Sequence, residues 1–124
     1  MPLRDLSVLH EVERSCLARY LDLLVETLGS GLVEVAVYGS VARGETWPRG
    51  MPIRSDLDLL VITDEPVPQA TVDALVDATM PLFLESGRQL GPQFKAVGEL
   101  GSSEFVRRVR EDAIVVYSRG RADA

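Results

Sequence analysis

Apolar residues recur at steps of three and four along the first quarter of the chain. The series runs Leu6, Leu9, Val12, Cys16, Leu17, Tyr20, Leu21, Leu24, Val25 and Leu28. This spacing puts its members on one face of an α-helix, so it predicts an amphipathic helix from about Arg4 to Leu28 within an N-terminal segment 1–28. Gly29 and Gly31 follow directly and are expected to end the helix.

Four shorter apolar runs, several of them rich in β-branched residues, predict strands. They cover residues 33–38 with Leu32, then 57–63, 94–100 and 113–117. A second helical pattern covers 70–84, with Pro81 as a point of disturbance, and a third begins at Ser102 or Ser103 and runs through Arg110. One helical turn is expected at 41–44, a loop at 45–55 and a frayed tail at 119–124.

The order of these elements predicts one domain over residues 1–124, of α/β or α+β class, with a mixed sheet of about four strands backed by helices. A chain of 124 residues with 46% hydrophobic residues suffices for such a core. No apolar run approaches the roughly 18 residues of a membrane span, and residues 1–13 carry charges where a secretory signal is apolar. We therefore expect a cytoplasmic protein with no membrane partner.

The net charge and the few cysteine and histidine residues limit which ligands and metal ions the chain can bind. The net charge of −6 argues against broad nucleic-acid binding, which needs a basic surface. Cys16 is the only cysteine and is expected to be a buried thiol, while His10 is the only histidine. A metal would therefore have to be held by carboxylates, which suit hard cations such as Mg2+ or Mn2+.

Two polar segments interrupt the apolar pattern next to predicted strands. Asp56 and Asp58 lie two residues apart at the start of a strand, so both side chains project from the same face. Their mutual repulsion is relieved when a cation lies between them. Gly39 and Ser40 follow another strand, where bare N–H groups and a hydroxyl can hold a phosphate. A phosphate site beside a dicarboxylate is the layout for metal-assisted phosphoryl or nucleotidyl transfer.

Residues 39–45 (GSVARGE) and 55–61 (SDLDLLV) resemble the paired motifs of the minimal nucleotidyltransferases, a family of the DNA polymerase β-like superfamily. The specific part of the likeness is the segment 38–63. The resemblance implies a sheet with helices on one face and Mg2+ on Asp56 and Asp58, which would be the catalytic carboxylates. It further implies that Gly39 and Ser40 bind the triphosphate of an NTP, with ATP expected, and that Arg43 lies nearby as a phosphate contact or a structural contact.

The chain departs from the family pattern in two places. The spacer from Val41 to Ser55 is longer than usual, and its Trp47 either stacks on a base or covers the loop. The family also supplies a third carboxylate from a later strand, and Lys95 occupies the aligned position here. A cation there would repel a second metal ion but could bind a phosphate, or could reach solvent from a sheet edge. Glu99 is the other candidate for the third acid.

Three hypotheses remain open. The first is an enzyme that passes a nucleoside monophosphate to a hydroxyl of a protein or small molecule, as an antitoxin that modifies a HEPN-type toxin would. The second is a catalytically degenerate member of the family that acts by binding nucleotide, a protein partner or further copies of itself. The third is a structural α/β domain in which Asp56 and Asp58 are ordinary surface acids.

Overall fold

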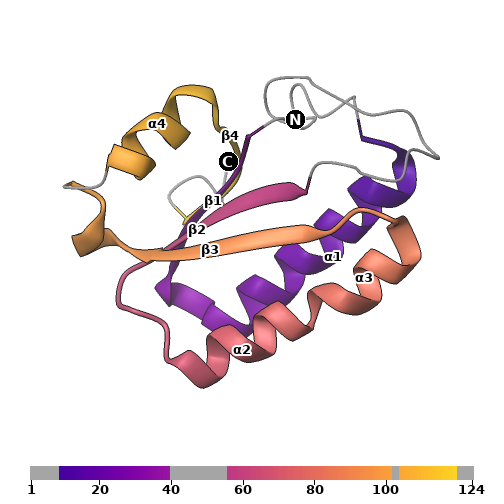
Figure 1. The fold of residues 1–124 in the computed structure, drawn as a ribbon. Coiled ribbons are helices and arrows are strands. Elements are labelled where there is room, and N and C mark those ends of the chain that lie inside the picture. The colour runs from indigo at the N-terminus through magenta and orange to yellow at the C-terminus, as the bar shows by residue number, and fades with distance from the viewer. Residues whose placement is uncertain (1–8, 40–55, 102–103, 120–124) are drawn as a thin grey trace.

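A computed structural model describes residues 9–39, 56–101 and 104–119 (Figure 1). Its helices are α1 (Glu11–Leu28), α2 (Gln69–Asp77), α3 (Thr79–Ser86) and α4 (Glu104–Asp112), with 3-10 turns η1 (Gly29–Gly31) and η2 (Val97–Glu99). Its strands are β1 (Leu32–Tyr38), β2 (Leu57–Thr63), β3 (Leu90–Ala96) and β4 (Ile114–Ser118). No helix within these ranges is both long and apolar enough to cross a bilayer.

The strands form one mixed sheet in the order β3-β2-β1-β4, which confirms the α+β class and the four-stranded sheet. The central pair β1 and β2 is antiparallel, β1 is antiparallel to β4, and β2 is parallel to β3. The register places Asp58 of β2 opposite Tyr38 of β1 and Gly91 of β3. Three neighbouring strands are therefore aligned at Asp58, the second residue of β2.

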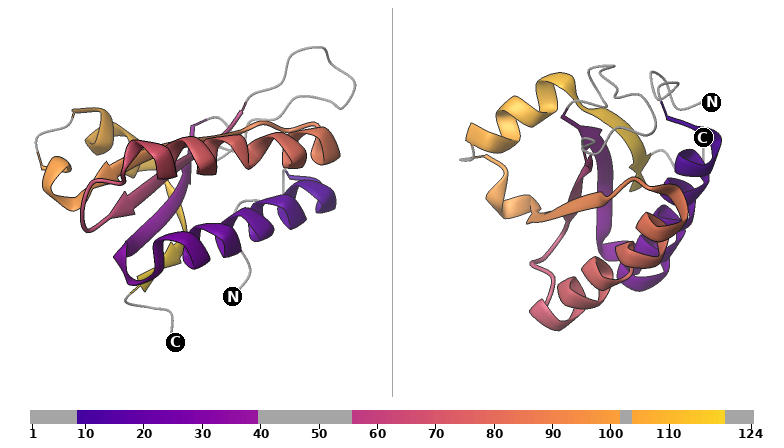
Figure 2. Two further views of the ribbon diagram at one scale, coloured as in Figure 1. Left: turned by 90° about the horizontal axis from the view of Figure 1, so that it is seen from below. Right: turned by 45° about the vertical axis from the view of Figure 1, so that its right-hand side comes forward.

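Both faces of the sheet carry helices, which corrects the expectation of helices on one face. Leu57, Leu59 and Val61 belong to the core beneath α1 and α2, whereas Leu60 and Ile62 belong to a second apolar cluster. Val106 and Val109 of α4 complete that second cluster. Figure 2 shows α4 apart from the layer of α1 to α3. A central strand that is apolar on successive residues needs cover on both sides.

Helix α1 begins at Glu11, later than the periodicity predicts. His10 has the extended backbone of an N-cap residue (ψ 161°). Its N–H donates to Oε1 of Glu13 at 2.7 Å, which satisfies one donor that a helix start leaves open. The apolar spacing continues through Leu9, but the capping contact determines where the helix starts.

The second predicted helix is two helices, because α2 ends at Asp77 and α3 begins at Thr79. Pro81 is the third residue of α3, has no N–H, and its ring crowds the carbonyl four residues earlier, that of Asp77. Thr79 compensates by donating its hydroxyl to the carbonyl of Val76 at 2.7 Å. Pro81 thus interrupts the helical hydrogen bonding one turn before its own position.

The third strand lies earlier than predicted, at Leu90–Ala96 rather than 94–100. Pairing with β2 determines this position, and β3 is an edge strand, where a proline such as Pro92 is tolerated. After Ala96 the chain turns into η2, and Glu99 accepts a 2.6 Å hydrogen bond from the Ala96 N–H. Glu99 is therefore a turn residue and not part of the strand.

The expected tail also begins later than residue 119. The guanidinium of Arg119 donates to the carbonyl of Ser30 and to Oδ2 of Asp64, both at 2.7 Å. These contacts join the end of β4 to the turn that precedes β1 and to the turn that follows β2. The remaining tail residues lie outside the described ranges, as do the proposed cap at Ser102 or Ser103 and the segment 41–55.

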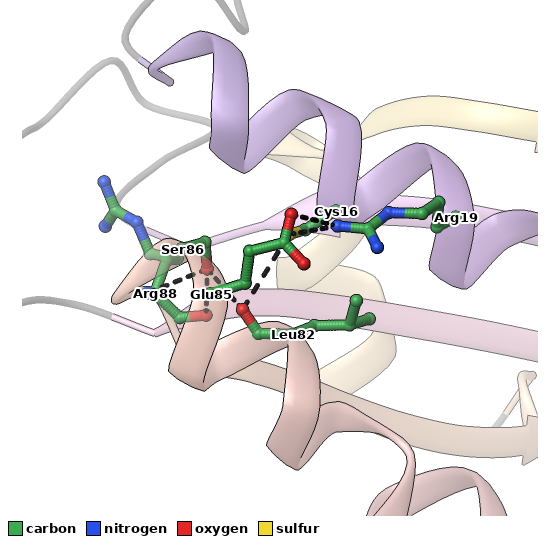
Figure 3. Close-up of polar contacts among 6 residues, drawn as sticks. All are labelled: Cys16, Arg19, Leu82, Glu85, Ser86 and Arg88. Atoms are coloured by element: carbon green, nitrogen blue, oxygen red, sulfur yellow. Dashed lines mark hydrogen bonds and ion pairs between the residues drawn. The ribbon is translucent and has the colours of Figure 1, made fainter.

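Polar contacts cross the seam between α1 and α3 (Figure 3). Cys16 is buried, as predicted; its Sγ accepts from Arg19, which also binds Glu85. Deeper in the structure, Nε of Arg88 lies 3.3 Å from Oε2 of Glu13, and the two side chains are only 2% and 0% exposed. This buried ion pair connects the start of α1 to Arg88 and Gln89, the two residues that precede β3.

The buried pair predicts an asymmetric response to mutation. Arg88→Met alone leaves the Glu13 charge buried, so we expect the free energy of unfolding to fall by about 3–5 kcal/mol in urea titrations. The Glu13→Leu/Arg88→Met double variant should lose clearly less. Arg19→Met, which breaks the exposed pair with Glu85, is the matched control and should cost about 1 kcal/mol or less. Equal costs for Arg88→Met and Arg19→Met would contradict this interpretation.

Candidate functional site

The carboxylates of Asp56 and Asp58 lie where β1 ends and β2 begins. Because these strands are antiparallel, Gly39 follows the Tyr38 that faces Asp58. Gly39 has a positive φ of 82°, and a Cβ built there would lie 2.5 Å from Oδ2 of Asp58. Any side chain at this position would displace the carboxylate. The lack of a side chain at position 39 therefore leaves room for the carboxylate of Asp58.

A second glycine flanks the carboxylates from the other strand. A Cβ built on Gly91 would lie 3.4 Å from Oδ1 of Asp58 and 3.9 Å from Oδ2 of Asp56. Both aspartate side chains therefore approach the same point on one side of the sheet, as the strand alternation predicts. Leu57 faces the opposite side, into the core beneath α1.

The surroundings of the two carboxylates differ. Asp56 is exposed, whereas Asp58 and the adjacent Tyr38 are half-buried. Burial, together with the negative charge of Asp58, raises the pKa of the Tyr38 phenol above its ordinary value of 10.0. Tyr38 consequently remains a protonated, neutral phenol across the physiological pH range, and its hydroxyl keeps its hydrogen-bond donor.

The donor set fits a hard divalent cation. Two carboxylates on one side of a strand, with glycines on both neighbouring strands, offer oxygen ligands and room beside them. Within the described ranges no cluster of three or more histidine, cysteine, aspartate or glutamate side chains is suited to a metal. The described part of the chain therefore supplies two candidate ligands, Asp56 and Asp58.

The structure does not bring Lys95 or Glu99 to these carboxylates. Lys95 pairs with Ile62, four positions along β2 from Asp58, which corresponds to roughly 13 Å of strand. Glu99 lies further on, in η2. The β3 residue beside Asp58 is Gly91. Ser40, Arg43 and Trp47 lie outside the described residues.

Two residues of the site were not singled out from the sequence. Tyr38 has a local signal, since it directly precedes the Gly39-Ser40 step. Gly91 has no local signal in the sequence, because its place beside Asp58 depends on how β3 pairs with β2.

Comparisons with known proteins agree with this fold. Residues 17–116 match the family model described as a nucleotidyltransferase domain, so the chain belongs to that family. No curated protein matches. A solved structure described as a minimal nucleotidyltransferase is 29% identical, with a TM-score of 0.55, over 85% of this chain and 95% of that one.

Two further neighbours come from toxin–antitoxin complexes. One contains a tri-AMPylated HEPN toxin from Shewanella oneidensis with its MNT antitoxin (12% identity, TM-score 0.53, 90% of this chain and 76% of that one). The other is a variant of the MntA–HpeT pair (14% identity, TM-score 0.52, 82% and 72%). At these identities the likeness concerns the fold.

The two glycines predict contrasting effects of a single methyl group. Gly39→Ala combines a positive φ with a 2.5 Å approach to Asp58, and the backbone strain alone should cost about 1–3 kcal/mol of stability. Gly91→Ala has ordinary van der Waals room and should stay within about 1 kcal/mol of wild type. Thermal unfolding of the two variants in parallel measures both. Equal melting temperatures would contradict the packing of Gly39 against Asp58.

Proposed function

We propose that the protein is a metal-dependent nucleotidyltransferase that passes a nucleoside monophosphate from an NTP, with ATP expected, to a hydroxyl of an acceptor. The observation that carries this proposal is the pair of carboxylates, Asp56 and Asp58, on one side of the sheet, with Gly39 close to the Asp58 side chain. The chain that holds them belongs to the nucleotidyltransferase domain family. In the reaction, the acceptor oxygen forms a bond to the α-phosphorus. The bond between that phosphorus and the oxygen that bridges it to the β-phosphate breaks, and pyrophosphate leaves.

Each site residue has a proposed role. Asp56 and Asp58 would hold Mg2+ or Mn2+, which supplies positive charge against the triphosphate when bound. Gly39, Ser40 and Arg43 would bind the phosphates, through backbone N–H groups, a hydroxyl and a guanidinium. A carboxylate oxygen of the pair would receive the proton of the acceptor hydroxyl.

The proposed acceptor is a protein, a toxin of the HEPN type, with this chain as its antitoxin. The support is the fold shared with the MNT antitoxin that was solved with an AMP-modified HEPN toxin. One observation favours the alternative of a degenerate binding module: among the described residues, Gly91 and not an acid adjoins the carboxylate pair on β3. Only the enzyme would transfer a nucleoside monophosphate, whereas both functions include nucleotide binding. Binding and transfer are therefore measured separately.

Nucleotide binding is measured as a thermal shift with each NTP, with and without Mg2+. At about 100 times its dissociation constant a ligand adds about 2.7 kcal/mol, a shift of several degrees for a domain of this size. We expect the shift to require Mg2+ and to vanish in Asp56→Asn/Asp58→Asn. The control Asp73→Asn/Asp77→Asn makes the same charge change on the exposed surface of α2 and should keep the shift. A shift that survives in the site variant would refute the assigned metal ligands.

Transfer is measured by intact mass of a HEPN-type protein after incubation with this chain, ATP and Mg2+. We expect the acceptor to gain one or more nucleoside monophosphates, with release of an equal amount of pyrophosphate. The site variant should give no gain, and Asp22→Asn/Glu26→Gln, which makes the same charge change on exposed residues of α1, should match wild type. Nucleotide binding without any gain of mass, on this or any other acceptor, would favour the binding module.

A further inference from the structure

Helices α2 and α3 expose an apolar stripe on their outer side. Val76, Met80, Phe83 and Leu84 are 43%, 53%, 36% and 74% exposed. Their spacing of three and four residues places them in one row along the two helices, which lie end to end (Figure 2). Leu75, Thr79 and Ser86 take up the buried side of the same helices. The stripe is therefore additional to the apolar face that the fold itself uses.

Exposed apolar side chains are ordinary when they are scattered, and informative when they gather. The other large apolar side chains exposed among the described residues are single: Val25 on α1, Val97 in η2 and Val115 on β4. Four in one row, on two short helices, form a continuous ridge. A ridge of this kind fits the groove between the side-chain rows of another α-helix.

The charge around the stripe selects the kind of partner. Residues 64–87 contain five carboxylates and neither lysine nor arginine. Asp73 and Asp77 are exposed and lie one helical turn apart, next to the row of Val76 and Met80. Glu85 borders the far end and binds Arg19 of α1. An acidic border repels nucleic acid and anionic lipid, and it disfavours pairing with a second copy that carries the same border.

We propose that the α2–α3 stripe is the docking site for a basic amphipathic helix of a partner protein. The helix would bury its apolar face on Val76, Met80 and Leu84 and place lysine or arginine side chains against Asp73 and Asp77. Asp58 projects from the opposite side of the sheet, the side that carries α4, so docking would leave the carboxylates open. The inference does not depend on the proposed activity.

Two synthetic helical peptides test this, with identical leucine positions and either lysine or glutamate at the polar positions. We expect the lysine peptide to bind, measured by fluorescence anisotropy of the labelled peptide, and the glutamate peptide not to bind. Met80→Ser/Leu84→Ser should weaken binding by about tenfold or more. Asp73→Asn/Asp77→Asn should also weaken it and reduce its dependence on salt. Val97→Ser/Val115→Ser is the matched control, with two exposed apolar residues changed elsewhere, and should bind as wild type does.

Several outcomes would overturn the proposal. They are equal binding of both peptides, binding of neither, or equal losses in the stripe and control variants. Sedimentation that shows a dimer, dissolved by Met80→Ser/Leu84→Ser, would assign the stripe to a second copy. Binding to vesicles of anionic phospholipid that the same variant abolishes would assign it to a membrane. Circular dichroism of each variant verifies that these surface changes leave the fold intact.

Discussion

The geometry of the site depends on the absence of a side chain at position 39, next to the carboxylate of Asp58. Gly39 and Gly91 flank it from β1 and β3, and Gly39 leaves no room for even a methyl group. This arrangement requires one register across three strands. A slip of one residue in β2 would turn Leu57, Leu59 and Val61 out of the core and bury both aspartates in it. The hydrophobic core therefore determines where the chemistry is placed.

The frame behind the site is held by polar contacts at the same end of the sheet. The carbonyl of Gln89 accepts a 2.8 Å hydrogen bond from the Leu57 N–H, which pairs the starts of β3 and β2. The preceding residue, Arg88, is anchored in the buried pair with Glu13 of α1. The capping contact of Glu13 and its ion pair thus join the start of α1 to the strand that carries Gly91. Buried ion pairs contribute little net stability, but losing one partner is costly, so this connection is sensitive to single changes.

What the sequence predicts well is local. The alternation of Asp56, Leu57 and Asp58 is sufficient to separate carboxylates from core, and the bounds of β2 agree with the pattern. The larger errors come from contacts between distant segments. The family resemblance implies that Lys95 stands where relatives have a third carboxylate, yet β3 begins earlier, so Gly91 adjoins Asp58 instead. The anchoring of Arg119 likewise depends on Ser30 and Asp64, which are distant in the sequence. The later start of α1 depends on a local contact between His10 and Glu13 that periodicity does not reveal, whereas the disturbance at Pro81 is predicted from the sequence.

The acidic balance of the chain bears on both proposals. An unscreened triphosphate approaching Asp56 and Asp58 meets two negative charges on a protein of net charge −6. The proposed nucleotide site would therefore need positive charge that arrives with the nucleotide, which is the electrostatic reason for the metal ion in that proposal. The α2–α3 surface faces the same constraint without a metal: Glu85 is paired with Arg19 of α1, but residues 64–87 supply no lysine or arginine for Asp73 and Asp77. There the compensating charge has to come from the partner, which is why a basic helix fits the stripe and a second copy does not.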